Sequence, residues 1–186
     1  MRAGDWAGFA FFTFALALSI LAGIEHPSIL GAVSVVHNGM LACIFLVRRQ
    51  PVKTDRAGLY LGLIASILPS TSFPDTVPLP LLVLGLAGYA LVLWSLTVLW
   101  KSFGIAPADR GLVTKAPYNL VRHPMYLGEL LLRVAIVISA EELWGYGMFL
   151  ALVLIQILRI KREETIIAGY EEYKQNTRWR LLPGVW

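Results

Sequence analysis

A polar, ring-rich segment, Arg110-Gly-Leu-Val-Thr-Lys-Ala-Pro-Tyr-Asn-Leu-Val-Arg-His-Pro-Met-Tyr-Leu-Gly128, stands between two long apolar runs of this chain. Pro124 suits the first turn of a helix, where its missing N–H would be unpaired in any case. The free N–H groups of that helix end would face back toward Arg122 and His123, which makes the segment a candidate anion site. The apolar runs on either side decide where this segment lies.

The composition indicates an integral membrane protein. Of the 186 residues, 57% are hydrophobic and 15% are charged, and the mean hydropathy is +0.66, whereas a soluble domain carries about 25% charged residues. A soluble helical domain with an unusually apolar core is the alternative, and the lengths of the apolar runs argue against it. The single cysteine, Cys43, lies inside an apolar run, so the sequence predicts neither a disulfide framework nor a thiolate metal cluster.

The apolar runs predict an all-α fold, a polytopic membrane bundle of about five to six transmembrane helices. The run at 57–69 is weaker than the others and the run at 126–140 is short. The expected spans are residues 6–23, 29–47, 57–69, 79–100, 126–140 and 143–160. We predict a single membrane domain, 1–186, made of N-terminal helices, a loop, a helical hairpin and a C-terminal helical tail, at 1–100, 101–123, 124–160 and 161–186 respectively.

Lysine and arginine are confined almost entirely to alternate connecting segments. The segments 48–56 and 101–122 hold four each and six follow from Arg159 onward, while the loops at 24–28, 70–78 and 140–142 hold none. This positive-inside pattern predicts a multi-pass protein whose two termini and 101–123 loop are cytoplasmic. It also explains the net charge of +4 without nucleic acid as a partner.

A tight turn at Glu141-Glu142 makes the last two spans an antiparallel hairpin, which brings Arg122 and His123 close to Glu163 and Glu164. The first pair flanks a helix start and suits a carboxylate or phosphate, although a topology anchor is the alternative for Arg122. The second pair suits a cation, because topology does not require acids on that side. Its alternative is a solvated pairing with neighbouring basic residues, Arg159, Lys161 or Arg162.

Tyr118 and Tyr126 add amphipathic rings that could face a cation or stack on a base, with an interfacial aromatic belt as the alternative. An anion anchor, a cation site and aromatic faces together suit a zwitterionic ligand that has a ring. S-adenosylmethionine is such a ligand, since it carries a carboxylate, a sulfonium and an adenine. A nucleotide or a lipid head group would also fit these features.

Glu129 and Arg133 stand four residues apart inside the short fifth span, where charges are costly unless they are paired or functional. We expect them on the protein-facing side, either near the entry path of a lipophilic substrate or as a neutral pair between two helices. Gly85 and Gly88 lie within a span, where close helix packing is their expected role. No metal-ligand spacing, Rossmann fingerprint or G-x-S-x-G motif occurs, so any catalysis would work by binding and positioning.

The polar segments resemble the isoprenylcysteine carboxyl methyltransferase family and its relatives, the phospholipid N-methyltransferases. The matching segments are Leu112–Tyr118, Arg122–Gly128, Glu163-Glu164, Tyr170–Tyr173 and Leu181–Pro183. The resemblance covers residues 100–186, while residues 1–99 are similar only in being spans. The link Thr165-Ile-Ile-Ala-Gly169 is shorter than the family's and lacks its Phe-Gly, so we expect a differently seated lid.

The resemblance implies a helical membrane methyltransferase that binds S-adenosylmethionine in a cytoplasmic cavity closed by the C-terminal segment. Cofactor-binding positions carried over by motif are Arg110, Gly111, Leu112, Val113, Tyr118, His123, Pro124, Met125, Tyr126 and Glu163. Arg159 matches an arginine associated with the substrate carboxylate, and Arg122 matches the motif arginine. The predicted catalytic residues are Arg159, Arg122 and Glu129, and the predicted substrate-binding residues are Arg159 and Arg133.

We therefore predict an S-adenosylmethionine-dependent methyltransferase whose lipophilic acceptor enters from the bilayer. The favoured reaction is carboxyl O-methylation of an isoprenylcysteine-like substrate. Arg159 would orient a carboxylate acceptor, which needs no base. An amine acceptor, as in a phospholipid N-methyltransferase, would need one, from Glu129 or His123. A non-catalytic lipid-binding protein and a sterol-type reductase with a nicotinamide cofactor are the alternatives from other classes. The expected partners are membrane lipids, without nucleic acid or metal.

Overall fold

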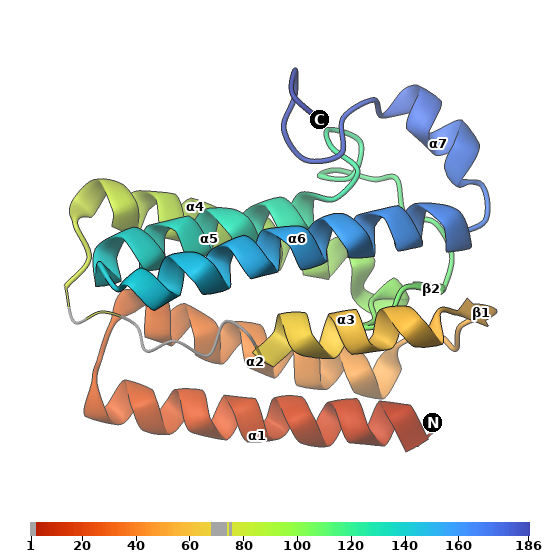
Figure 1. The fold of residues 1–186 in the computed structure, drawn as a ribbon. Helices are drawn as coiled ribbons and strands as arrows, with labels where there is room; N and C mark the ends of the chain where they lie inside the picture. Colours follow the sequence, from red (N-terminus) through yellow and green to blue (C-terminus); the bar gives the residue numbers. More distant parts are fainter. Residues whose placement is uncertain (1–2, 68–73, 75) are drawn as a thin grey trace. The chain divides into compact units, whose positions relative to one another are not determined.

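The computed structural model describes residues 3–67, 74 and 76–186, and its regular elements are almost all helices (Figure 1). The end of the third predicted span, residues 68 and 69, lies outside the described residues. Two compact units make up the chain, Met1–Arg49 and Gln50–Trp186. The polar motifs quoted above all belong to the second unit.

The first unit is a hairpin of two apolar helices, α1 (Ala3–Glu25) and α2 (Ile29–Val47). Ser28 caps α2 by accepting a hydrogen bond from the backbone N–H of Gly31 at 3.0 Å, a usual way to satisfy a free helix end. At the open end of the hairpin, the Nε of Arg48 donates to Asp5 at 2.8 Å. Both side chains are buried, so each charge is paired where burial would otherwise be costly.

The second unit contains the remaining helices and one small sheet. The helices are α3 (Arg56–Ile67), α4 (Leu79–Leu99), α5 (Pro124–Ala140), α6 (Leu143–Ile166) and α7 (Tyr170–Asn176), and a single 3₁₀ turn, η1 (Trp100–Ser102), extends α4. The sheet pairs β1 (Lys53–Thr54) with β2 (Ala108–Asp109) in antiparallel register.

Helices α4 and α5 approach each other unusually closely, at Gly88 and Gly128. A Cβ atom at either glycine would lie 2.6 Å from the carbonyl oxygen of the other, nearer than real Cβ contacts come. Small residues at such a crossing let the two backbones touch. The predicted packing role of Gly88 is therefore confirmed, and its partner Gly128 closes the polar motif that precedes α5.

The small sheet holds the loop after α4 against α3 and α6. The backbone N–H of Asp55 donates to the Pro107 carbonyl at 2.9 Å, and its carboxylate accepts from Arg162 of α6 at 2.8 Å. A Cβ at Gly62 of α3 would clash with the carbonyl of Ile105. This loop is thus fixed from two sides by backbone contacts.

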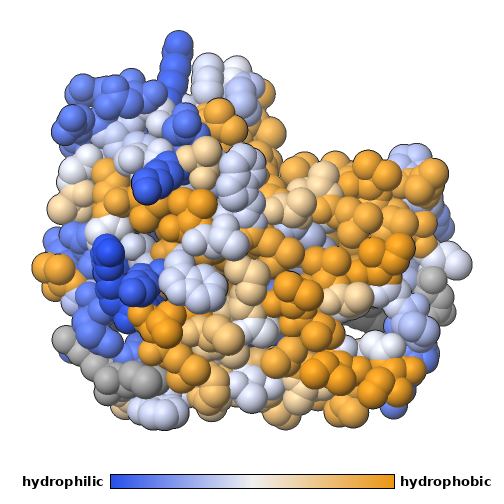
Figure 2. All heavy atoms as spheres, turned by 180° about the vertical axis from the view of Figure 1, so that it is seen from behind, coloured by the Kyte–Doolittle hydropathy of each residue, from blue (hydrophilic) through white to orange (hydrophobic). Residues whose placement is uncertain are grey.

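The predicted all-helical membrane bundle is confirmed. Within the described ranges, four helices are long and apolar enough to cross a membrane: α1, α2, α6, and α4 together with η1. Helices α3 and α5 are shorter, about 18 Å and about 25 Å against about 30 Å of hydrocarbon. They correspond to the runs that the sequence marks as weak and short. Figure 2 shows broad apolar surface on one face, with hydrophilic side chains gathered around α7 and the C-terminal segment.

Two helix ends refine the predicted boundaries. Helix α5 begins at Pro124, as the proline rule indicates, and ends where Glu141 adopts a left-handed conformation with φ 54°. Helix α6 continues past residue 160 to Ile166, because Lys, Arg and Glu are good helix formers. Glu163 and Glu164 therefore lie on the last turns of a helix and not in a separate tail.

Candidate functional site

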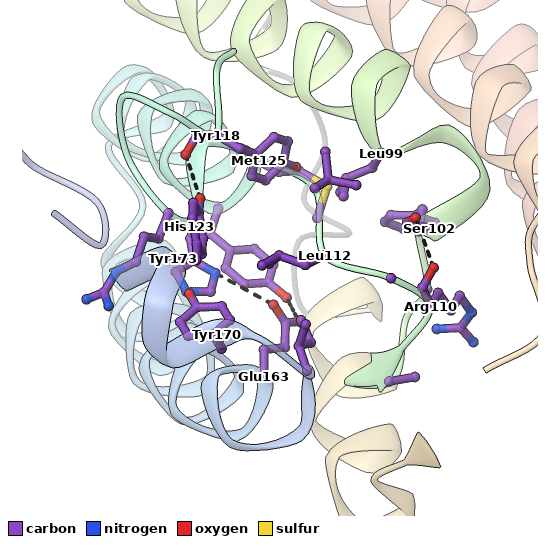
Figure 3. Close-up of a pocket in the computed structure, with 18 of the residues that line it drawn as sticks. Leu99, Ser102, Arg110, Leu112, Tyr118, His123, Met125, Glu163, Tyr170 and Tyr173 are labelled. Atoms are coloured by element: carbon purple, nitrogen blue, oxygen red, sulfur yellow. Dashed lines mark hydrogen bonds and ion pairs between the residues drawn. The ribbon is translucent and has the colours of Figure 1, made fainter. Parts of the chain in front are cut away.

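A cavity lies in the second unit between the loop after α4, the start of α5, the end of α6 and α7 (Figure 3). It has about 710 Å³ of empty space, part of which is open solvent. Most of the residues expected to bind a cofactor line it: Arg110, Gly111, Leu112, Val113, Tyr118, His123, Met125, Tyr126 and Glu163, together with the expected catalytic residue Arg122. Pro124 buries its ring in the first turn of α5 and does not line it.

Glu163 points into this cavity from α6. Its carboxylate accepts a hydrogen bond from the hydroxyl of Tyr126, and its Oε2 lies 3.6 Å from Nδ1 of His123. The rings of His123 and Tyr126 stack at 5.7 Å between centroids. In Figure 3 the side chains of His123, Tyr170 and Glu163 converge from three different elements. A negative group framed by rings is an arrangement that suits a cationic ligand.

Glu164, the next residue, faces the C-terminal segment. Its two carboxylate oxygens accept from Nε and Nη2 of Arg180 at 2.9 and 2.7 Å. Nη2 of Arg122 and Nε2 of His123 each lie 3.5 Å from the same carboxylate. The side chain is only 12% exposed. The alternative of a solvated pairing with basic neighbours on α6 is therefore wrong for Glu164, since its partners lie far away in the sequence.

The C-terminal segment binds the backbone just before the helix start that the sequence marked as an anion site. The backbone N–H groups of Arg122 and His123 donate to the carbonyls of Trp179 and Arg180 at 2.8 and 2.9 Å. The carboxylate beside them is that of Glu164. The C-terminal segment is thereby tied to the start of α5 by backbone and by charge.

His123 carries the charge that joins the two glutamates. Burial lowers the pKa of its imidazole, but the facing carboxylates of Glu163 and Glu164 outweigh burial and leave the pKa above the ordinary value of 6.5. Its Nε2 also lies 2.9 Å from the hydroxyl of Tyr170. Burial raises the pKa of the Tyr170 phenol, so that hydroxyl stays neutral; it accepts from the charged imidazole and donates to Oε1 of Glu164 at 3.5 Å.

A sharp turn forms the opposite wall. Gly111 has φ 94°, which glycine adopts without strain. Asp109 fixes the turn: one carboxylate oxygen accepts from Gly111 N–H at 3.1 Å and the other accepts from Ala168 N–H at 3.3 Å. Ser102 donates to the Arg110 carbonyl at 3.2 Å. Neither Asp109 nor Ser102 was expected from the sequence, because a polar residue in a loop gives no signal by itself.

Helix α7 closes the cavity with two tyrosines. Tyr173 donates its hydroxyl to the carbonyl of Tyr118 at 2.5 Å, and Tyr170 reaches His123. Both tyrosines line the cavity and both are buried. They lie in the closing motif of the resemblance, which signalled a family segment but not a site role.

Arg159 lies behind the cavity wall and is not among its lining residues. Its guanidinium carbon sits 4.7 Å from the centre of the Tyr126 ring. Nη1 donates to Gln156 at 3.0 Å and Nη2 donates to the Ile105 carbonyl at 3.2 Å. Gln156 in turn donates to Glu129. The cavity and this buried group therefore share Tyr126 as their partition.

Glu129 and Arg133 lie on α5, away from the lining of the cavity, and both are partly buried. Glu129 reaches across to α6 through its hydrogen bond with Gln156, which the sequence did not single out. Gln156 could have been identified in the sequence as the single amide side chain within its apolar run. In the stretches 3–67, 74 and 76–186, no group of three or more His, Cys, Asp or Glu side chains is placed to hold a metal ion.

Fold and cavity together define an all-helical integral membrane protein with a cavity among its polar residues. The family model described as phospholipid methyltransferase matches residues 81–174, half of the chain, from α4 to α7. The chain belongs to this phospholipid methyltransferase family, a membrane methyltransferase family with lipid-like substrates. The resemblance drawn from the polar motifs is thus confirmed. Searches among curated proteins and among solved structures find no match.

Proposed function

We propose that this protein transfers a methyl group from S-adenosylmethionine to the carboxylate of an isoprenylcysteine-like lipid. Membership of the methyltransferase family supports the reaction type. One observation carries the choice of acceptor: Arg159 is a buried cation whose Nε has no hydrogen-bond partner among the described residues.

The side chains around the cavity fit the proposed cofactor. Glu163, Tyr126 and Tyr170 offer a carboxylate and aromatic faces for a positively charged sulfonium. The turn at Arg110 and Gly111 offers a guanidinium and a backbone able to approach a ligand closely. When bound, S-adenosylmethionine supplies an electrophilic methyl group, which a carboxylate accepts as it stands and an ammonium group accepts only after losing a proton.

The donors of Arg159 fit the proposed acceptor. A guanidinium has five N–H groups and no acceptor, and Gln156 and Ile105 take one each. An unsatisfied buried donor costs about 1–3 kcal/mol, and more when it is charged. A substrate carboxylate would accept hydrogen bonds from the remaining donors. Binding of the acceptor's head group would thereby remove the cost of leaving these donors of Arg159 unpaired.

The neighbouring residues would support this binding without reacting. Tyr126 lies between Glu163, which holds its hydroxyl, and Arg159, which faces its ring, so acceptor and cofactor would meet beside this ring. The proposed role of Arg122 is to fix Glu164 and, through it, the C-terminal segment over the cavity. The protein would thus contribute orientation and exclusion of water.

An amine acceptor is the second candidate, and Glu129 is the observation in its favour. Its carboxylate lies in the same buried group as Arg159, where it could take a proton from a phospholipid amine. The description of the matching family model points the same way.

A methyl-transfer assay on the full chain in lipid nanodiscs tests the proposal. Radiolabelled S-adenosylmethionine is supplied with S-farnesyl-N-acetylcysteine in one arm and phosphatidylethanolamine in the other. The expected product is a base-labile methyl ester in the first arm. Base-stable label in phosphatidylethanolamine would instead establish the amine candidate.

A thermal-shift series on the same preparation separates the other classes. Stabilisation by S-adenosylmethionine and its demethylated product is expected, and NADPH should have no effect. Stabilisation by NADPH alone would indicate a reductase. No shift with any of the three would indicate a lipid-binding protein.

A further inference from the structure

A row of polar side chains, buried on α6 and partly buried on α5, joins the two helices behind the cavity. Gln156, 1% exposed, stands in the middle of this row. Its Nε2 donates to Oε2 of Glu129, and its Oε1 accepts from Nη1 of Arg159 at 3.0 Å. The remaining donor bond of Arg159 goes to the backbone carbonyl of Ile105. The amide therefore separates a carboxylate from a guanidinium.

The two neighbours fix the direction of this amide. Turning it around would set its oxygen against the Glu129 carboxylate and its NH₂ against the Arg159 guanidinium. Both contacts would then join like groups, acceptor to acceptor and donor to donor, and both hydrogen bonds would be lost. Gln156 is consequently a bridge with one stable orientation.

Without the bridge, the two charges would attract each other directly. Opposite charges in a buried setting interact far more strongly than in water, and a buried ion left alone is costly. A carboxylate that reached Arg159 would use up the donors that the proposed acceptor needs. The glutamine gives each charge a partner while keeping the two apart.

We propose that Gln156 is a specificity-determining positioning residue, which keeps Glu129 off Arg159 so that the guanidinium selects acceptors with a free carboxylate. The inference rests on the proposed function and deepens it. Selection follows from the donor count: Nε and further N–H groups of Arg159 remain for a bidentate carboxylate. An esterified head group carries no charge and offers weaker acceptors.

The test measures binding, so that it does not depend on turnover. The probes are S-farnesyl-N-acetylcysteine and its methyl ester, titrated by calorimetry into the full chain in nanodiscs. Wild type should bind the acid at least about tenfold more tightly than the ester, as a charge-assisted pair predicts. Gln156→Met keeps the length of the side chain without its hydrogen bonds, and it should lose that preference by weakening acid binding alone.

A double variant separates positioning from packing. In Gln156→Met/Glu129→Gln the competing carboxylate is gone, so the preference for the acid should return. A purely structural role of Gln156 would leave the double variant as weak as the single one. Gln175→Met, on the exposed surface of α7, is the matched control and should behave as wild type.

Two further measurements make every outcome decisive. Affinity for the demethylated cofactor product should be unchanged in all variants, which reports an intact cavity. If Gln156→Met fails this check, Gln156→Glu replaces it and should lose acid binding, because its carboxylate would itself occupy Arg159. Unchanged acid affinity in these variants overturns the inference alone. A wild type without preference for the acid overturns both the inference and the carboxylate acceptor, while cofactor binding still reports the methyltransferase.

Discussion

His123 links two carboxylates on neighbouring residues of α6. Nδ1 faces Glu163 on the cavity side and Nε2 faces Glu164 on the side of the C-terminal segment. Because these contacts favour the charged imidazole over the effect of burial, the pKa of His123 lies above 6.5 in the folded protein. Its protonation state thus affects both the cavity and the segment that covers it.

This raised pKa predicts how stability depends on pH. The folded state holds the proton of His123 more tightly than the unfolded state, so the stabilisation is complete below pH 6.5 and is lost as the pH rises through the folded-state pKa. The difference in thermal stability between wild type and His123→Asn should therefore shrink as the pH is raised above 6.5. His26→Asn, at an exposed position, is the control. A difference that stays constant over this range would contradict the prediction.

Glu163 gives a second prediction at the residue scale. If its carboxylate faces the sulfonium, Glu163→Gln should weaken the binding of S-adenosylmethionine by about tenfold or more. The affinity of this variant for the demethylated product should fall less, because that product carries no sulfonium charge. Calorimetry with both ligands measures the difference, and Glu171→Gln, whose side chain is 78% exposed, is the matched control. Equal losses for the two ligands would argue against a cation site at Glu163.

At the scale of elements, the α4–α5 crossing sets the position of the cavity wall. Gly128 ends the motif that begins with Arg122, and it touches Gly88 backbone to backbone. Three residues between Arg122 and Gly128 line the cavity: His123, Met125 and Tyr126. The spacing of two helices and the placement of the site therefore depend on the same contact.

Gly128→Ala should consequently destabilise the protein. The added Cβ would lie 2.6 Å from the Gly88 carbonyl oxygen, so the helices would have to separate. We expect a loss of about 1–3 kcal/mol, the usual cost of overpacking, measured by thermal or denaturant unfolding. Gly147→Ala on α6 has nothing within 4 Å of its added Cβ and should be neutral or slightly stabilising. Equal stability of the two variants would show that the crossing can widen freely.

For the whole molecule, charge distribution predicts the orientation in the membrane. The exposed residues Lys115 and Glu142 should lie on opposite sides, with Lys115 in the cytoplasm. Cys43 is exposed and must first be replaced by serine. An impermeant maleimide added to intact cells should then label Glu142→Cys but label Lys115→Cys only after lysis. Labelling of Lys115→Cys in intact cells would reverse the predicted orientation.

Local rules were sufficient for the helices and for one half of the site. The second span is Ile29–Val47 in both the prediction and the structure, because an unbroken apolar run needs no distant partner to be recognised. Pro124 marked the start of α5 for the same reason, since its fixed φ acts on its own turn. The ten lining residues named in advance came from motif resemblance and from the hairpin that brings residues 122 and 163 together.

Which side chains pair with which across the fold was beyond the reach of the sequence. Glu164 pairs with Arg180 and Arg122, where neighbouring basic residues were equally plausible partners. The carbonyls of Trp179 and Arg180 accept from the backbone just before α5. Gln156 between Glu129 and Arg159 depends on how α5 and α6 face each other. The sequence by itself determined a helical membrane protein of a methyltransferase family with its polar motifs at the helix ends. Only the tertiary structure decided which charges meet, because hydrophobicity acts locally along the chain while hydrogen bonds and ion pairs require particular atoms within about 3 Å.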